Sequence, residues 1–78
     1  MNIESFFPGR LRVSSELFTT QENVDKIVER VNTIDGIKNI SSNLRTGSIT
    51  VLYNPLAISM DMLMEAKAEI ERLEGELN

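Results

Sequence analysis

Few side chains in this chain could carry chemistry, and its only sulfur donors are methionines. Met60, Met62 and Met64, with Met1, present thioethers of the kind that bind copper(I). Residues two apart on a helix point about 200° away from each other, so the three neighbouring thioethers cannot converge on one ion. We therefore expect these methionines to fill the hydrophobic core.

Carboxylates and guanidinium groups are the remaining candidates for binding. The acidic residues that could hold a hard cation near the C-terminal end are Asp61, Glu65, Glu69, Glu74 and Glu76. We expect them to form a solvated helix face, partly paired with Lys67 and Arg72. Arg10 and Arg12 alternate with apolar residues along a predicted strand and therefore point outward. They are candidates for binding an anion or an acidic partner, although charges on an edge strand also protect against aggregation.

The donors that most metal sites and many enzymes need are missing. The sequence contains no Cys and no His, so it forms no disulfide and lacks the usual ligands of zinc and copper(I). It also has no phosphate-binding glycine loop and no pair of carboxylates flanked by apolar residues. We therefore expect neither a bound cofactor nor enzymatic activity.

Length and charge further limit the possible domain organisation and partners of the chain. Seventy-eight residues, of which 41% are apolar and 26% charged, suit one compact domain spanning residues 1–78. The net charge of −4 argues against nucleic acid as a partner. The sequence has no run of about 18 apolar residues and no basic N-terminal segment followed by an apolar run. We therefore expect a cytoplasmic protein without membrane insertion.

The candidate residues must be positioned by the elements that the hydrophobic pattern predicts. Two-residue alternation indicates strands, three-to-four-residue spacing indicates helices, and Thr20 and Ser59 are suitable helix caps. In chain order the expected elements are strand 10–14, helix 21–33, strand 37–43, turn 44–47, strand 48–53 and helix 59–77. This order predicts an α+β, ferredoxin-like β-α-β-β-α sandwich with an antiparallel sheet, in which an extended C-terminal helix replaces a missing fourth strand.

The segment before the first predicted strand has two interpretations. Phe6, Phe7 and Pro8 either cover the open side of the sheet, which we expect, or form an exposed apolar docking arm. Because the fourth strand is missing, strand 10–14 would be left as an unprotected edge if the protein is a monomer.

Several core and turn positions resemble a known family. Helix residues Ile27, Val31 and Ile34, then Gly36-Ile37, Ile40 and the strand ending Val51-Leu52-Tyr53-Asn54-Pro55, are similar to the heavy-metal-associated domain. Copper chaperones and the N-terminal repeats of copper-transporting P-type ATPases contain this domain. Residues 9–13 and 46–48 look more like a divergent, cysteine-poor branch, which is often encoded in bacteria near metal-transport ATPases. The resemblance covers roughly residues 9–70. The residues that carry it meet requirements of the core and the turns and do not form a metal-binding motif.

The resemblance implies where metal would bind and why it does not bind here. Family members that move metal carry two cysteines where the first strand meets the first helix. Counting back from Gly36 places those positions at Thr20 and Asn23. A hydroxyl and an amide are neutral, hard donors, so metal transfer by the family mechanism is excluded. The surrounding loop could retain a docking role, with Leu17 and Phe18 as apolar anchors, or these residues could simply close one end of the core.

The last predicted helix carries an apolar seam. Leu63, Ala66, Ile70, Leu73 and Leu77 are spaced three, four, three and four residues apart, which is a heptad pattern. We expect a sheet of three strands to be too small to cover Ile70, Leu73 and Leu77. The chain is therefore expected to form a homo-oligomer, most simply a dimer, through this helix, strand 10–14 or both. The alternative is that the helix folds back wholly on its own sheet.

Three functions remain compatible with the sequence. The favoured one is a non-enzymatic protein-interaction or assembly module on a degenerate heavy-metal-associated scaffold, with a metal-transport ATPase as one candidate partner. The second is a small-molecule sensor similar to the ACT regulatory domains, which share the ferredoxin-like fold. The third is a noncanonical metal binder that uses methionine and carboxylate ligands.

Overall fold

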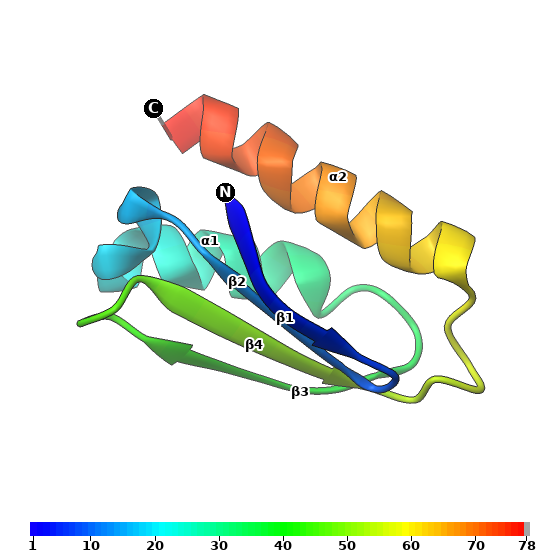
Figure 1. Ribbon diagram of the computed structural model, residues 1–78. Helices are drawn as coiled ribbons and strands as arrows, with labels where there is room; N and C mark the ends of the chain where they lie inside the picture. Colours follow the sequence, from blue (N-terminus) through cyan, green and yellow to red (C-terminus); the bar gives the residue numbers. More distant parts are fainter. Residues whose placement is uncertain (78) are drawn as a thin grey trace.

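The computed structural model, which describes residues 1–77, contains one antiparallel sheet with both helices on the same face (Figure 1). The sheet has four strands in the order β1-β2-β4-β3. The elements are β1 Asn2–Phe7, β2 Arg10–Ser14, a 3-10 helix η1 Glu16–Thr19, α1 Gln21–Val31, β3 Ile37–Asn43, β4 Ser48–Tyr53 and α2 Met60–Leu77. The predicted α+β, ferredoxin-like fold is confirmed.

The strand count differs from the prediction, because the N-terminal segment supplies a fourth strand. β1 and β2 form a hairpin in which Phe6 lies opposite Leu11 and Ile3 opposite Val13. Gly9 completes the turn with a φ of +89°. The register shifts between Ile3 and Ser5, so the inward positions Ile3 and Phe6 are three residues apart. This bulge breaks the two-residue alternation and hides the strand from the sequence pattern.

The pairing of β1 corrects two expectations about this end of the chain. β2 lies between β1 and β4, so the strand of Arg10 and Arg12 is an interior strand and not an edge. Phe6 and Phe7 are neighbours on β1 and therefore point to opposite faces, and about half of each side chain is exposed. Of these two side chains, only that of Phe7 lies over the open side of the sheet.

The core lies between the sheet and the two helices. Its sheet residues lie at alternating positions, and its helix residues at three-to-four-residue spacing, as the sequence predicts. The buried apolar side chains of the strands and helices are Leu11, Val13, Ile49, Val51, Tyr53, Val24, Ile27, Val31, Leu63, Ala66, Ile70 and Leu73. Each leucine-sized side chain contributes about 1.5–3 kcal/mol when it leaves water. Phe18 of η1 and Ile58 of the segment before α2 are buried in the same core.

Both helices begin where their caps predict. Thr20 Oγ1 accepts a hydrogen bond from Asn23 N at 3.4 Å, and Ser59 Oγ accepts one from Met62 N at 3.3 Å. α1 ends at Val31, two residues earlier than predicted.

The C-terminal helix folds back on its own domain. Ile70 is 1% exposed and Leu73 is 7% exposed, and only Leu77, at the last turn, remains half-buried. Arg30 Nη1 and Glu69 Oε1, 2.9 Å apart, link α1 to α2. The predicted free seam is therefore wrong for Ile70 and Leu73, since a three-four spacing serves packing within a subunit equally well. Neither helix within residues 1–77 has the length and apolar character needed to cross a membrane.

Gly47 fixes the turn between β3 and β4. Its φ is +67°, its carbonyl accepts a 2.9 Å hydrogen bond from Ser15 N, and a Cβ at this position would lie 2.5 Å from the Ser15 carbonyl oxygen. We predict that Gly47→Ala lowers the free energy of unfolding by about 1–3 kcal/mol, because the side chain clashes with backbone and strains φ.

Urea denaturation followed by circular dichroism measures this change. Gly75→Ala is the matched control, because Gly75 lies in a helix with open space around the added Cβ. That substitution is expected to raise stability by about 0.5 kcal/mol. Equal effects of the two substitutions would contradict the role assigned to Gly47.

Candidate functional site

The two positions that correspond to the family's cysteines make local hydrogen bonds. Thr20 caps α1, as described above, and Asn23 Nδ2 donates a 2.9 Å hydrogen bond to Leu17 O. The bond holds η1 against the first turn of α1 in a partly buried position. These neutral groups therefore hold the loop in place, and the chelating function of two thiolates has no counterpart here.

The two predicted anchors of this loop lie in different environments. Phe18 is 0% exposed and belongs to the core, so it closes one end of the core and presents no surface to a partner. Leu17 is half-buried and packs against the same core. Of the two, only Leu17 has surface that a partner could touch.

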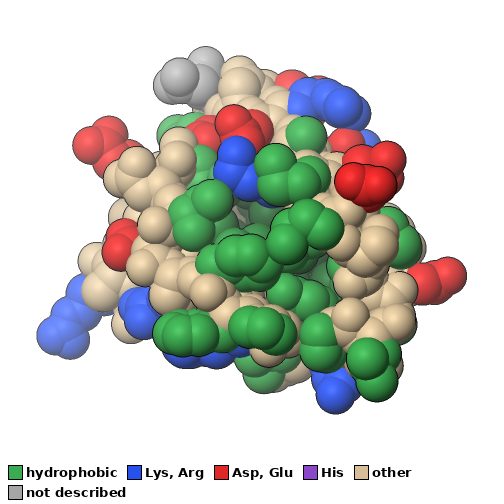
Figure 2. Space-filling view, turned by 45° about the vertical axis from the view of Figure 1, so that its right-hand side comes forward, with side chains coloured by type: hydrophobic (Ala, Val, Ile, Leu, Met, Phe, Trp, Pro, Cys, Tyr) green, Lys and Arg blue, Asp and Glu red, His purple; other side chains and the backbone are tan. Residues whose placement is uncertain are grey.

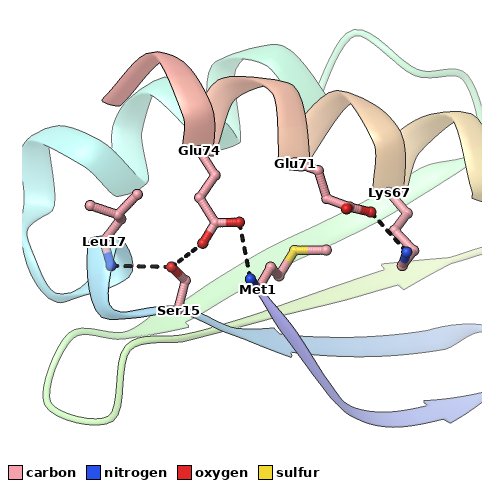
Figure 3. Close-up of polar contacts among 6 residues, drawn as sticks. All are labelled: Met1, Ser15, Leu17, Lys67, Glu71 and Glu74. Carbon is pink, nitrogen blue, oxygen red and sulfur yellow. Dashed lines mark hydrogen bonds and ion pairs between the residues drawn. The ribbon is translucent and has the colours of Figure 1, made fainter. Parts of the chain in front are cut away.

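A second set of polar contacts joins the loop to α2 (Figure 3). Ser15 Oγ accepts a 3.2 Å hydrogen bond from Leu17 N and donates one to Glu74 Oε2. Glu74 Oε1 also lies 3.1 Å from the Met1 amine. The Glu74 carboxylate thus connects α2 to the start of β1 and to the loop. The sequence assigned Glu74 to a solvated face, because no local pattern reveals a partner 59 residues away.

A polar hollow of about 550 Å³ lies beside this carboxylate. Its walls come from the loop, the start of the chain and the last turns of α2: Met1, Asn2, Ser14, Ser15, Glu16, Leu17, Glu71, Glu74 and Gly75. The acidic residues of α2 otherwise form the predicted solvated and paired face, with Lys67 bonded to Glu71 and Arg72 to Glu69, each at 2.8 Å. Within residues 1–77, no three Asp, Glu, His or Cys side chains are grouped in a way that could hold a metal ion.

Arg10 and Arg12 lie on the interior strand β2, on the open face of the sheet away from the helices. Their neighbours Leu11 and Val13 are buried on the helix side, so the two arginines occupy the other side. Arg12 Nη2 donates a 3.4 Å hydrogen bond to Ser48 Oγ on β4. The outward orientation predicted for both residues is confirmed.

The methionines of α2 are not in the core, which corrects the prediction that they fill it. Met60 is 60% exposed, Met62 is 36% exposed and Met64 is 54% exposed. Met60 and Met64, four residues apart, face β1, whereas Met62 lies on the α1 side beside Ile34. In this part of α2, the core positions are taken by Leu63 and Ala66. Sequence periodicity predicted the apolar seam of this helix but could not show that the methionines lie beside it.

An apolar groove runs between β1 and the first turns of α2, and we call it the edge groove. Its walls are Ile3, Phe6, Leu11, Met60, Leu63 and Met64, with Lys67 at one end. The edge groove continues into a hollow of about 260 Å³ lined also by Pro8, Tyr53 and Pro55. Figure 2 shows hydrophobic side chains gathered around a depression on this side of the molecule.

Lys67, which lines the edge groove, forms an ion pair with Glu71, which lines the polar hollow. The Lys67 ammonium donates a 2.8 Å hydrogen bond to Glu71 Oε1, and this bond and the positive charge lower the pKa of Glu71. We predict that Lys67→Ala raises the pKa of Glu71 towards its ordinary value, which a carboxyl-detected NMR titration measures.

The lowered pKa of Glu71 makes the stability of the folded protein depend on pH. A carboxyl group with a lowered pKa in the folded state stabilises the fold above its unfolded pKa, and this contribution disappears as the pH falls through the folded pKa. The effect on stability is small because the pair is exposed to solvent. Lys26→Ala, which breaks an exposed pair on α1, is the control and leaves the titration of Glu71 unchanged. An unaltered Glu71 titration in Lys67→Ala would contradict the assignment.

Comparison with known proteins supports the resemblance noted in the sequence. Neither the curated proteins nor the solved structures give a match. A family model described as heavy metal associated domain 2 matches residues 1–78. The match extends over the whole sequence, including β1 and α2, and the sequence contains no cysteine. The chain therefore belongs to the heavy metal associated domain 2 family.

Proposed function

We propose that this domain is a non-enzymatic protein-interaction module of the cytoplasm, in which the scaffold of a metal-associated domain docks proteins and does not carry metal. The proposal includes an accessory role in metal transport, with a metal-transport ATPase as a candidate partner, because such domains occur in copper-transporting ATPases. Its support is the edge groove, the place where apolar side chains of the sheet and of α2 remain open to solvent together.

The composition of the edge groove suits a protein partner. Ile3, Phe6, Met60 and Met64 are each about half exposed, and they adjoin the buried residues Leu11 and Leu63. Contiguous exposed apolar surface of this kind marks interaction sites. Flexible thioether side chains adapt to different partner side chains, as in other methionine-rich docking surfaces. The adjoining hollow of about 260 Å³ suits the side chains of a partner and is too small to enclose a typical ligand.

The loop at the family's metal position is less suited to docking. Its Thr20, Asn23 and Ser15 side chains are engaged by the chain itself, and Phe18 is buried. A partner would have to break these bonds before it gained new ones. Interaction therefore shifts, in this proposal, from the loop to the edge groove.

The simplest partner is a second copy of the chain. β1 is the edge strand next to the edge groove, and its outer backbone groups have no strand partner among residues 1–77. Two such edges can meet across a two-fold axis, which would cover both grooves at once. This contact replaces the one expected from Ile70 and Leu73, which are buried within the domain.

One observation favours a second candidate function. The polar hollow of about 550 Å³ beside Ser15 and Glu74 lies in the size range of small-molecule sites, and its carboxylate already pairs with an amine, that of Met1. A sensor of small amines or amino acids is the corresponding function. Calorimetric titration with a panel of amino acids separates it from the docking module, since the module gives no heat of binding.

The dimer is tested by a charge placed in the edge groove. We predict that Met64→Glu raises the dissociation constant of the dimer at least tenfold, because it puts a carboxylate into a surface that must be desolvated. Light scattering after size exclusion, across micromolar concentrations, measures the association.

Leu56→Glu is the matched control for this experiment. Leu56 is 95% exposed and lies outside the edge groove, so the same change of charge leaves the dimer intact. A wild-type protein that stays monomeric at high micromolar concentration excludes the dimer. The groove itself remains testable by the binding of a separate partner protein.

The loss of metal transfer is tested by restoring the thiols. We predict that wild-type protein binds no stoichiometric copper(I), whereas Thr20→Cys with Asn23→Cys gains one copper(I) per chain, since two thiolates would then face each other at the start of α1. Competition with a chromogenic copper(I) chelator measures the affinity, and each single cysteine variant is the control. Tight copper(I) capture by the wild type would overturn the proposal and favour binding by methionine and carboxylate groups.

A further inference from the structure

Charge is divided between the two layers of this domain. Residues 16–35 and 61–77, which contain the helices, hold eleven of the twelve acidic residues and four of the eight basic ones. Their formal charge is therefore −7. Residues 5–15 and 36–60, which contain most of the sheet, hold the other four basic residues and no acidic residue. With Glu4 included, the strand segments have a formal charge of +3, in a protein whose net charge is −4.

The open face of the sheet is a regular array built on the strand register. It consists of three rows across β1, β2, β4 and β3: Phe7, Arg10, Leu52 and Asn39; Ser5, Arg12, Thr50 and Ser41; Asn2, Ser14, Ser48 and Asn43. The array contains two cations, hydroxyl and amide groups, and two exposed apolar side chains, Phe7 and Leu52. Glu4 approaches it at one corner, where its carboxylate accepts a 2.6 Å hydrogen bond from Ser14 Oγ.

Arg12 at the centre of this array has unused hydrogen-bonding capacity. Its guanidinium makes one long hydrogen bond, 3.4 Å to Ser48 Oγ, and no salt bridge among residues 1–77 involves it. Its Nε and the Ser5 hydroxyl on the neighbouring strand are buried without a partner in the part of the chain that the structure describes. Arg12 as a whole is only half-buried, so a partner that engages its terminal nitrogens would gain strong, charge-assisted hydrogen bonds.

We propose that the open sheet face binds an acidic segment of a partner protein, with Arg10 and Arg12 each engaging one carboxylate. Side chains two residues apart on a strand lie about 7 Å apart, which is also the spacing of alternate side chains in an extended peptide. Arginine binds carboxylates in a bidentate manner, and the flanking Phe7 and Leu52 can pack against the aliphatic parts of the bound segment. This surface lies on the other side of the sheet from the edge groove, so the inference is independent of the dimer.

The same features argue against other occupants of this face. A second copy placed face to face would bring four arginines together, which is unfavourable. Single-stranded nucleic acid binds sheets through several stacked aromatic residues, and this face offers Phe7 alone. Anionic membranes attract clusters of about four to eight basic residues, whereas this array has two.

Peptide binding followed by NMR tests the proposal. The probe is an eight-residue peptide that alternates Glu and Ser, with blocked ends, and the comparison peptide alternates Gln and Ser. We expect the Glu peptide alone to shift backbone amide signals of β2 and β4. The double variant Arg10→Gln, Arg12→Gln is expected to weaken binding at least tenfold.

A matched variant separates this site from a general effect of charge. Lys26→Gln with Arg72→Gln removes the same two charges from the helix layer, and it is expected to change the affinity less than twofold. Equal losses in both double variants would overturn the proposal, as would no binding of the Glu peptide. Stronger, arginine-dependent binding of octauridylate or of phosphatidylserine vesicles would overturn the assignment to a protein partner. Circular dichroism checks that both variants remain folded.

Discussion

The antiparallel pairing of β1 with β2 decides which surfaces this domain can present. By covering the flank of β2, β1 places Arg10 and Arg12 in the middle of a sheet and moves the exposed edge to Asn2–Phe7. The same strand directs Ile3 and Phe6 towards α2 and Phe7 towards the opposite face. One hairpin therefore creates an apolar surface on the helix side and completes a polar one on the other. Without it, the strand that carries the arginines would be an edge.

The two proposed surfaces differ in the physical origin of their affinity. The edge groove would gain free energy by removing apolar side chains from water, a contribution that depends weakly on salt. The open sheet face would rely on ionic hydrogen bonds, which salt screens and which favour fast, oriented encounters. A small domain with both surfaces can hold two partners at once, because the sheet separates them. Such an arrangement suits a protein that brings other proteins together.

Local patterns predicted most of the fold, and long-range contacts account for what they missed. The sequence identified α1 and α2 by their caps, Thr20 and Ser59, and β4 by its run of β-branched residues. Each of these signals depends on nearby residues alone. The bulge at Glu4 hid β1, and heptad spacing could not show whether α2 packs on its own sheet or on a second copy. At the candidate site, the sequence identified the loop and the outward arginines. The bond between Ser15 and Glu74 spans 59 residues, and no sequence pattern reports it.

The exposed thioethers of Met60 and Met64 also make the edge groove sensitive to oxidation. Met60 and Met64 are more than half exposed, so oxidants can reach their sulfur atoms without unfolding the domain. Conversion to the sulfoxide would turn two apolar walls into strongly polar ones, and reductases can reverse it. A scaffold without thiols would in this way still respond to oxidative stress, through the very side chains that line its groove.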